Sequence, residues 1–419
     1  MKLFNTSLPV ILFTTVFPIQ ANSQETVWGK MLGSDKEEYV LNHVVDNGGN
    51  IYIPGKTKGD IGGSNLGQND GFVIKLDRSG NELWSVQFGS DGDEDIQWSA
   101  LDNSGNIYVT GFTTGALTGK NYGKEDVLIV KYSSSGKLVW KKQIGSDSTD
   151  IAKGICVDAR GFVYVTGMTT GRLGQVSRGK SDCFLIKLDQ DGNIVKTVQF
   201  GTEKDDMCYS VVPGMHNSVF VCGTTWGNLE GTNAEFVDSF TGHFTSDLKR
   251  PEFHQFGSEG FDIPLVLAAD DRNDLFVAGT TSGNFASAQA GAGDCFILRM
   301  DKKGEIIWKR QFGTDQNDGV RGIDINDKVS DKVFISGIIN LPPEKAFIRI
   351  YNKNGDMLCE RIFEAQGFTG GTSGKDIHID KKGNITHLGL TGTPLFGRLI
   401  GEKDVYIVKI DINKYLHAR

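Results

Sequence analysis

The sequence predicts an all-β protein: a seven-bladed β-propeller of four-stranded antiparallel sheets, with the ring closed by the N-terminal strand joining the C-terminal blade. Three observations lead to this fold class. A glycine between an apolar residue and Ser or Thr recurs every 56 residues, at positions 33, 89, 145, 201, 257 and 313. Each interval contains four strand-like runs, and incomplete sets of runs remain at the two ends. A long fixed period of this kind is typical of one supersecondary unit copied around an array.

The four runs are clearest in the second copy of the repeat. They are rich in Val, Ile, Tyr and Phe and cover Ile96–Asp102, Ile107–Phe112, Val127–Tyr132 and Leu138–Ile144. Short Asp/Asn/Gly segments such as 102–106 separate them, and these residues favour the tight turns of hairpins. Each copy is therefore expected to form an antiparallel meander.

The two ends of the chain indicate how the array closes. The run Val27–Gly33 matches the last strand of a repeat but has no companions before it. The final runs, Asp376–Asp380, Ile385–Leu390 and Val405–Asp411, lack a last strand after them. Joining these pieces completes a seventh sheet and removes the free edges that an open array would leave.

The repeat resembles a known family. The pattern W-x-x-x-F-G-[ST], then V-D-x-x-G-N-I-Y-V-x-G-x-T, then D-x-F-x-x-K-x-D-x-x-G, is similar to the bacterial seven-bladed beta-propeller repeat (SBBP) family. The likeness covers the chain after residue 26, and Asp102–Thr113 is its most specific part. The fourth, sixth and seventh copies depart from the pattern, for example with His243 at a lysine position. The resemblance implies this fold and an exported protein, but no particular reaction and no catalytic residue.

The N-terminus predicts export. Lys2 precedes an apolar run, Leu8–Phe17, and small residues flank Asn22 at a cleavage-like site. Residues 1–23 are therefore expected to be a signal peptide and 24–419 one propeller domain in the periplasm, at the cell surface or in the medium. The apolar run is too short to span a bilayer.

The amino-acid composition limits the classes of molecule that the protein is expected to bind. The net charge is −8 and the chain has no basic run, which argues against nucleic acid as a partner. We expect a monomer. No segment after the N-terminal run is long and apolar enough to be a membrane helix. Of the six cysteines, Cys208 and Cys222 fall near facing positions of one predicted hairpin. They could form a disulfide there, and the alternative is that they are two buried thiols.

Acidic residues recur in register with the repeat. Three columns are present: 35, 91, 147, 203, 259 and 315; then 38, 94, 150, 206, 262 and 318; then 70, 126, 182, 238, 294 and 404. One interpretation is a calcium-binding surface, with Asp91, Glu94, Asp147 and Asp150 as candidate ligands. The favoured interpretation is structural, because a residue needed in every blade is needed by the blade. The basic column that contains Lys75 and the threonine column that contains Thr57 are interpreted in the same way.

Function is expected where the repeat breaks its own pattern. In the innermost strand, one position reads Leu, Gln, Lys, Tyr, Leu and Arg in successive copies, and the next position is equally variable. These residues should surround the mouth of the central channel. The candidate ligand-binding residues there are Trp98, Lys153, Tyr209 and Arg321, with Trp226 and Arg172 on loops of the same face. The alternatives are random drift at exposed positions, or Trp98 plugging the channel.

No catalytic constellation is present in the sequence: the histidines lack metal-ligand spacing, and there is no nucleophile elbow or phosphate loop. The first hypothesis is a non-enzymatic binding module for a protein, glycan or surface ligand. The second is a lyase- or hydrolase-type enzyme with a calcium-assisted site in the channel, and the third is a purely structural surface protein. No cofactor is required by the first hypothesis.

Overall fold

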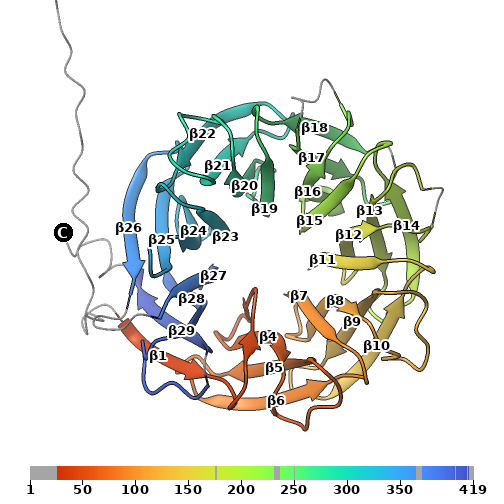
Figure 1. The fold of residues 1–419 in the computed structure, drawn as a ribbon, viewed down its shortest axis with the longest axis vertical. Coiled ribbons are helices and arrows are strands. Elements are labelled where there is room, and N and C mark those ends of the chain that lie inside the picture. The colour runs from red at the N-terminus through yellow and green to blue at the C-terminus, as the bar shows by residue number, and fades with distance from the viewer. Residues whose placement is uncertain are drawn as a thin grey trace, which may run out of the picture.

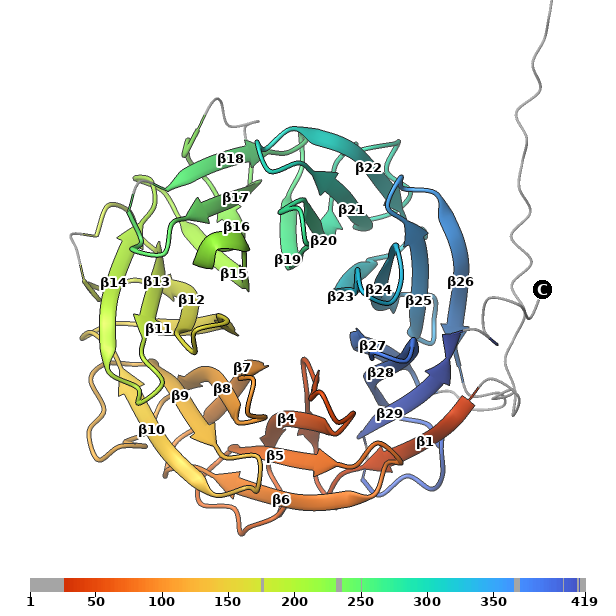
Figure 2. The same ribbon diagram turned by 180° about the vertical axis from the view of Figure 1, so that it is seen from behind.

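The structure is a computed structural model that describes residues 26–174, 177–230, 236–249, 251–364, 370–401, 403–412 and 414. Seven antiparallel sheets stand around a central axis like the blades of a propeller (Figures 1 and 2). The predicted fold class is therefore confirmed. The predicted signal peptide, residues 1–23, lies outside the described residues. No helix in the described ranges is long and apolar enough to cross a membrane.

The first four blades follow the chain in order. Blade 1 contains β2 (Glu38–Tyr39), β3 (Val44–Val45), β4 (Ile51–Thr57), β5 (Asp70–Leu76) and β6 (Glu82–Phe88). Blade 2 contains β7 (Glu94–Leu101), β8 (Ile107–Thr113), β9 (Asp126–Tyr132) and β10 (Leu138–Ile144). Blade 3 contains β11 (Asp150–Val157), β12 (Val163–Thr169), β13 (Asp182–Leu188) and β14 (Ile194–Phe200). Blade 4 contains β15 (Asp206–Pro213), the 3-10 turn η1 (Met215–Asn217), β16 (Val219–Thr225), β17 (Asp238–Phe244) and β18 (Glu252–Phe256).

The remaining blades include the closing sheet. Blade 5 contains β19 (Asp262–Ala269), β20 (Leu275–Thr281), β21 (Asp294–Met300) and β22 (Ile306–Phe312). Blade 6 contains β23 (Gly319–Ile325), β24 (Lys332–Ile339), β25 (Lys345–Asn352) and β26 (Met357–Phe363). Blade 7 contains β27 (Thr372–Ile379), β28 (Asn384–Thr391), β29 (Asp404–Asp411) and β1 (Thr26–Leu32).

Blade 7 joins the two ends of the chain, as predicted. Strand β1 pairs antiparallel with β29, with Leu32 opposite Val405 and Lys30 opposite Ile407. The sheet order is β1-β29-β28-β27, so the outermost strand comes from the N-terminal end. The ring therefore has no missing blade strand at its seam.

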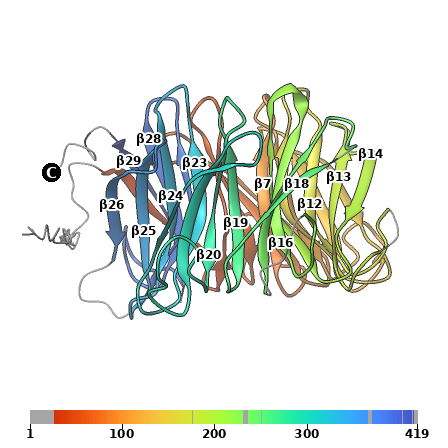
Figure 3. The same cartoon turned by 90° about the horizontal axis from the view of Figure 1, so that it is seen from above.

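The strands run between two faces of the ring (Figure 3). We call one the loop face, where the chain enters the innermost strand of each blade and where the long loops follow the second strand. We call the other the turn face, where hairpin turns join the first to the second strand and the third to the fourth. On the turn face, Asp102 Oδ1 accepts hydrogen bonds from the backbone N–H of Ser104 and Asn106, at 2.9 and 3.0 Å. Gly105 takes the left-handed backbone conformation, with φ 75°, that this turn requires.

Neighbouring blades are tied together at the turn face by two repeated donors. Trp84 Nε1 and Lys75 Nζ of blade 1 both donate to the backbone carbonyl of Ser134 in blade 2, at 3.1 and 2.7 Å. Trp140 and Lys131 do the same to Gln190 in blade 3, at 3.1 and 3.0 Å. The basic column therefore has a structural role, which explains its place in the repeat.

The hydrophobic core is divided among the blade interfaces rather than gathered in one centre. One cluster at the seam joins Leu32 and Val405 of blade 7 with Ile51, Ile53 and Phe72 of blade 1. Because each sheet is covered on both faces by its neighbours, the third strand of blade 2, β9, is buried along its whole length. Strands of this kind are continuous apolar runs in the sequence, and such runs predict buried strands.

Candidate functional site

The innermost strand of each blade contains an irregularity that points a side chain at the central axis. In β7 the register with β8 shifts between Ile96 and Trp98, so Gln97 is an extra residue without a partner in the ladder. A bulge of this kind redirects the side chain that it carries. The same shift occurs in the other blades after the first, and the extra residues are Lys153, Tyr209, Leu265, Arg321 and Lys375. In blade 1 the corresponding segment is the break between β2 and β3, which contains Leu41.

These seven residues surround one cavity of about 410 Å³ on the axis of the ring. Its lining comes from all seven blades and is completed by five further residues: Tyr39, Lys56, Asp95, Trp98 and Val266. The structure thus brings together four of the six predicted residues: Trp98, Lys153, Tyr209 and Arg321. Their proposed role in ligand binding stays a prediction.

The other two predicted residues do not line the cavity. Arg172 is exposed on the loop after β12. Trp226 directly follows β16 on the loop face, where its backbone N–H donates to the carbonyl of Asp205 at 3.0 Å. Its ring lies edge-on to Phe261, with ring centroids 5.8 Å apart, and Phe261 is in turn 5.8 Å from Phe236. We call these three residues the aromatic rim cluster; they are 47%, 42% and 44% exposed respectively.

The cavity is positively charged although the chain as a whole is acidic. Four basic side chains line it: Lys56, Lys153, Arg321 and Lys375. Asp95 is the one carboxylate among the described lining residues, and Lys56 Nζ forms an ion pair with its Oδ2. Gln97 Nε2 donates to the other oxygen of Asp95 at 2.5 Å. The single acid is therefore already neutralised, and the excess charge of the lining is positive.

Two of the lysines are held in a partly desolvated state. Lys375 is 7% exposed, and its Nζ lies 5.1 Å from the centre of the Tyr39 ring. Burial, followed by the positive charge of Arg321, lowers the pKa of Lys375 to about 8. Lys153 Nζ donates to Gln97 Oε1 at 3.0 Å, and burial lowers the pKa of Lys153. A cation that has lost its water and has no carboxylate partner gains the most from a bound anion.

The calcium candidates divide into two kinds. Asp91 and Asp147 are exposed loop residues. Glu94 and Asp150 are buried and bond within the protein: Glu94 Oε1 accepts from Ser90 Oγ and Thr113 Oγ1, both at 2.6 Å. Asp150 accepts in the same way from Ser146 Oγ and Thr169 Oγ1. In these two blades the second acidic column therefore fastens the entry loop to the second strand, and the threonine column supplies a hydroxyl donor.

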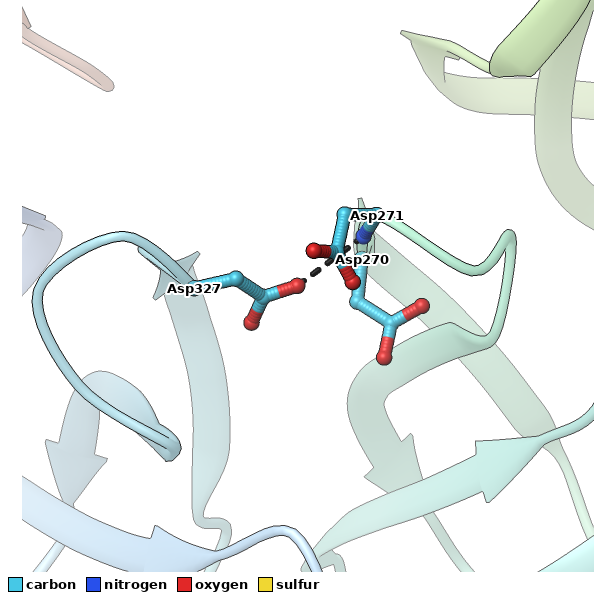
Figure 4. Close-up of side chains that lie close together, drawn as sticks. All are labelled: Asp270, Asp271 and Asp327. Carbon is cyan, nitrogen blue, oxygen red and sulfur yellow. Dashed lines mark hydrogen bonds between the residues drawn. The ribbon is translucent and has the colours of Figure 1, made fainter.

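One group of three acidic residues lies on the turn face. Asp270 and Asp271 follow β19, and Asp327 follows β23, with their carboxylates close together (Figure 4). The backbone N–H of Asp271 donates to Asp327 Oδ2 at 2.9 Å. Lys353 Nζ lies 2.9 Å from Asp270 Oδ2 and 2.6 Å from Asp327 Oδ1. The ammonium group therefore occupies the position of a counter-ion, and this cluster needs no metal.

The cysteines do not form the disulfide that the sequence left open. None of the six, all of which lie in the described part of the chain, is in a disulfide, and Cys156, Cys183, Cys208, Cys222 and Cys295 are buried. The register of the hairpin places Cys208 opposite Gly223 and Cys222 opposite Ser210, so the two cysteines are not paired with each other.

The fold and the cavity define a class: a closed seven-bladed propeller with a cavity on its axis. Residues 139–174 match the model of the SBBP beta-propeller repeat. This match and the ring of seven blades support the resemblance that the motifs indicated.

Comparison with known proteins agrees on the fold. The chain is 26% identical over 305 residues to the regulatory protein FlaEY of Caulobacter vibrioides, an alignment that covers 64% of this chain and 32% of FlaEY. The chain thus spans about a third of that relative. The WD40 β-propeller domain of Doa1 superimposes with a TM-score of 0.52 at 12% identity, over 94% of this chain and 99% of that domain. The polysaccharide lyase Uly1 gives 0.51 at 10% identity, over 95% and 94%. Identities this low establish the propeller architecture alone.

Proposed function

We propose that the protein is a non-enzymatic binding module that holds a negatively charged glycan at the loop face, with an acidic group of the glycan in the axial cavity. The observation that carries this proposal is the charge of the lining. Four cations converge there from different blades, and among the described lining residues Lys56 alone is paired with a carboxylate of the cavity. A carboxylate or sulfate group would satisfy the guanidinium of Arg321 and the ammonium groups of Lys153 and Lys375.

The aromatic rim cluster favours a glycan over a small anion. Trp226 follows the second strand of blade 4 and Phe261 precedes the first strand of blade 5, both on the loop face. The innermost strands of the same two blades carry the bulge residues Tyr209 and Leu265, three residues after each strand begins. Exposed aromatic faces pack against the apolar faces of sugar rings, and residues with one apolar and one polar part are common in binding sites. A chain of sugars could therefore contact the rim and the cavity together.

The same charge argues against the calcium-assisted enzyme considered above. A hard cation needs several oxygen ligands, and among the described lining residues Asp95 alone offers a carboxylate. The cavity also provides no second carboxylate for acid–base chemistry on a glycosidic bond.

The test is a titration of the protein with alginate oligosaccharides, which carry carboxylates, and with uncharged dextran oligosaccharides of equal length. We expect binding of alginate alone, weakening as salt rises. Arg321→Ala combined with Lys375→Met should weaken it at least about tenfold, because each charge-assisted bond contributes about 1.5–3 kcal/mol. Lys141→Ala, an exposed lysine on the outermost strand β10, is the control and should change nothing. Equal affinity of the double variant and the control would refute the site.

Export and the monomeric state are part of the proposal, and the apolar run and cleavage-like site within residues 1–23 support export. N-terminal sequencing of the protein recovered outside the cytoplasm should begin at or next to Gln24. Recovery of a chain that still begins at Met1 would contradict the signal peptide.

A further inference from the structure

A second type of site lies between the blades, at the glycine that marks the repeat. At the junction of blades 1 and 2, a Cβ atom on Gly89 would lie 2.2 Å from Asp70 Oδ1 and 2.8 Å from Glu94 Oε2. Asp70 begins the third strand of blade 1 and Glu94 begins the first strand of blade 2. Two carboxylates from neighbouring blades therefore approach each other in the space that a side chain at residue 89 would take.

The hydrogen bonds at this junction leave one carboxylate oxygen without a donor. Asp70 Oδ2 accepts from the backbone N–H of Leu66 at 2.9 Å and from Gln87 Nε2 at 3.0 Å. Asp70 Oδ1, on the side of Glu94, has no hydrogen-bond partner, and both acids are fully buried. A buried anionic oxygen that faces a second carboxylate is strongly unfavourable unless a positive charge compensates it.

The arrangement recurs around the ring. At the junction of blades 5 and 6, a Cβ on Gly313 would lie 2.5 Å from Asp294 Oδ1 and 2.8 Å from Asp318 Oδ2. Asp294 Oδ1 also lacks a partner, as do Asp126 Oδ1 and Glu38 Oε2 at two other junctions. Among the described residues, no lysine, arginine or histidine that could neutralise Asp70 or Asp294 forms an ion pair with either.

One junction departs from this pattern in an informative way. Between blades 6 and 7, Lys345 is paired with Ile339. Lys345 thus has the same place in its blade that Asp70, paired with Thr57, has in blade 1. Thr372, opposite Thr391, takes the position of Glu94 opposite Thr113. Where the two acids are lost, the chain places Lys345 at one of the two positions, and its Nζ forms an ion pair at 2.5 Å with Glu364, the residue at the position of Gly89.

Backbone carbonyl groups add neutral oxygen atoms at the same junctions. A Cβ on Gly67 would lie 2.4 Å from the carbonyl oxygen of Ser90 and 2.5 Å from that of Gly92. At the seam, the equivalent point on Gly401 lies 2.7 Å from Lys36 O, 3.1 Å from Ser34 O and 3.3 Å from Asp404 Oδ1. At the seam, loop carbonyls therefore lie beside the Asp404 carboxylate, and such a set of oxygen donors suits a hard divalent cation.

We infer that each junction with two carboxylates binds a calcium ion between its blades. The ion would be held by the Asp70–Glu94 pair, or its equivalent, together with carbonyl oxygens of the loop that enters the next blade. It would link adjacent blades at the loop face, as the tryptophan and lysine donors link them at the turn face. This inference does not depend on the axial cavity or its ligand.

The experiment measures calcium directly. The purified protein is treated with chelator, dialysed against calcium, and its bound metal is counted by elemental analysis. We expect more than one calcium per chain and a higher melting temperature than in chelator. Asp70→Asn combined with Glu94→Gln should remove one calcium and leave the others, so the loss is a count that does not require loss of folding.

A matched control uses the same loop. Asp91→Asn removes one negative charge from an exposed position next to Glu94 and should leave the calcium count unchanged. A wild-type chain that retains no calcium would overturn the inference. So would a count that falls equally with Asp91→Asn, which would indicate binding to the acidic surface instead. A chain that binds no calcium and is stabilised by the double variant would show that a shared proton compensates the carboxylates.

Discussion

Leu32 provides the sharpest test of how the ring is closed. It lies on β1, is 7% exposed, and packs with Val405 and Ile407 of the strand it pairs with. Replacing a buried leucine with alanine costs about 2–5 kcal/mol in the free energy of unfolding, through lost apolar contact and the cavity left behind. Because β1 reaches blade 7 from the opposite end of the chain, this cost should appear first as local detachment of β1 from β29.

Amide hydrogen exchange measures this opening strand by strand. A loss of about 2–5 kcal/mol corresponds to exchange that is faster by about 30-fold or more. We expect this acceleration in β1 and β29 of Leu32→Ala, with the least change in β12 and β13 across the ring. Leu83→Ala on the outermost strand of blade 1 is the control, since Leu83 is 52% exposed and should cost less than about 0.5 kcal/mol. An equal acceleration in every blade, or none in β29, would refute closure through β1.

Four further results are expected. Binding of an anionic ligand should weaken as pH rises through about 8, where Lys375 loses its charge, and Lys375→Arg should keep its affinity at pH 9; a flat profile in the wild type would exclude this lysine from the site. Because the folded-state pKa is lowered, the same group should make the protein more stable as pH rises from about 8 towards 10.5, which thermal unfolding can check. Trp84→Phe removes the bond to Ser134 and should cost about 0.5–1.5 kcal/mol in denaturant unfolding. A thiol reagent should label Cys359 first and six thiols after unfolding, and fewer than six would reveal a disulfide.

The 56-residue period and the apolar runs within it were enough to predict the blades. A strand that is buried on both faces must be apolar along its length, so each buried strand is visible in the sequence. It also placed Lys153, Tyr209 and Arg321 at the axis, since they share one position in successive copies. Lys375 was missed because the sixth copy is shorter and puts the equivalent residue only 54 positions after Arg321. Lys56 was missed for a different reason: it lies on the second strand of blade 1 and reaches the cavity only through its pairing with Tyr39.

Pairwise geometry was less accessible to sequence reasoning. Cys208 and Cys222 are predicted near facing positions, but in the bulged hairpin Gly223 lies opposite Cys208 and Ser210 lies opposite Cys222. The same unseen bulge explains why the variable column points inward at all. A one-residue insertion in a ladder leaves no periodic signal, so its presence could not be deduced from the spacing of apolar residues.

The bulge also affects which amino-acid substitutions the propeller can tolerate during evolution. Its residue is absent from the register of paired positions in the innermost strand, and its side chain projects into the axial cavity. Each of the bulge positions can therefore exchange size or charge with little effect on the packing between sheets. The paired strands of the blades would stay the same, while one cavity-lining side chain in each blade could be substituted. A library restricted to these positions should yield altered recognition while most members remain folded.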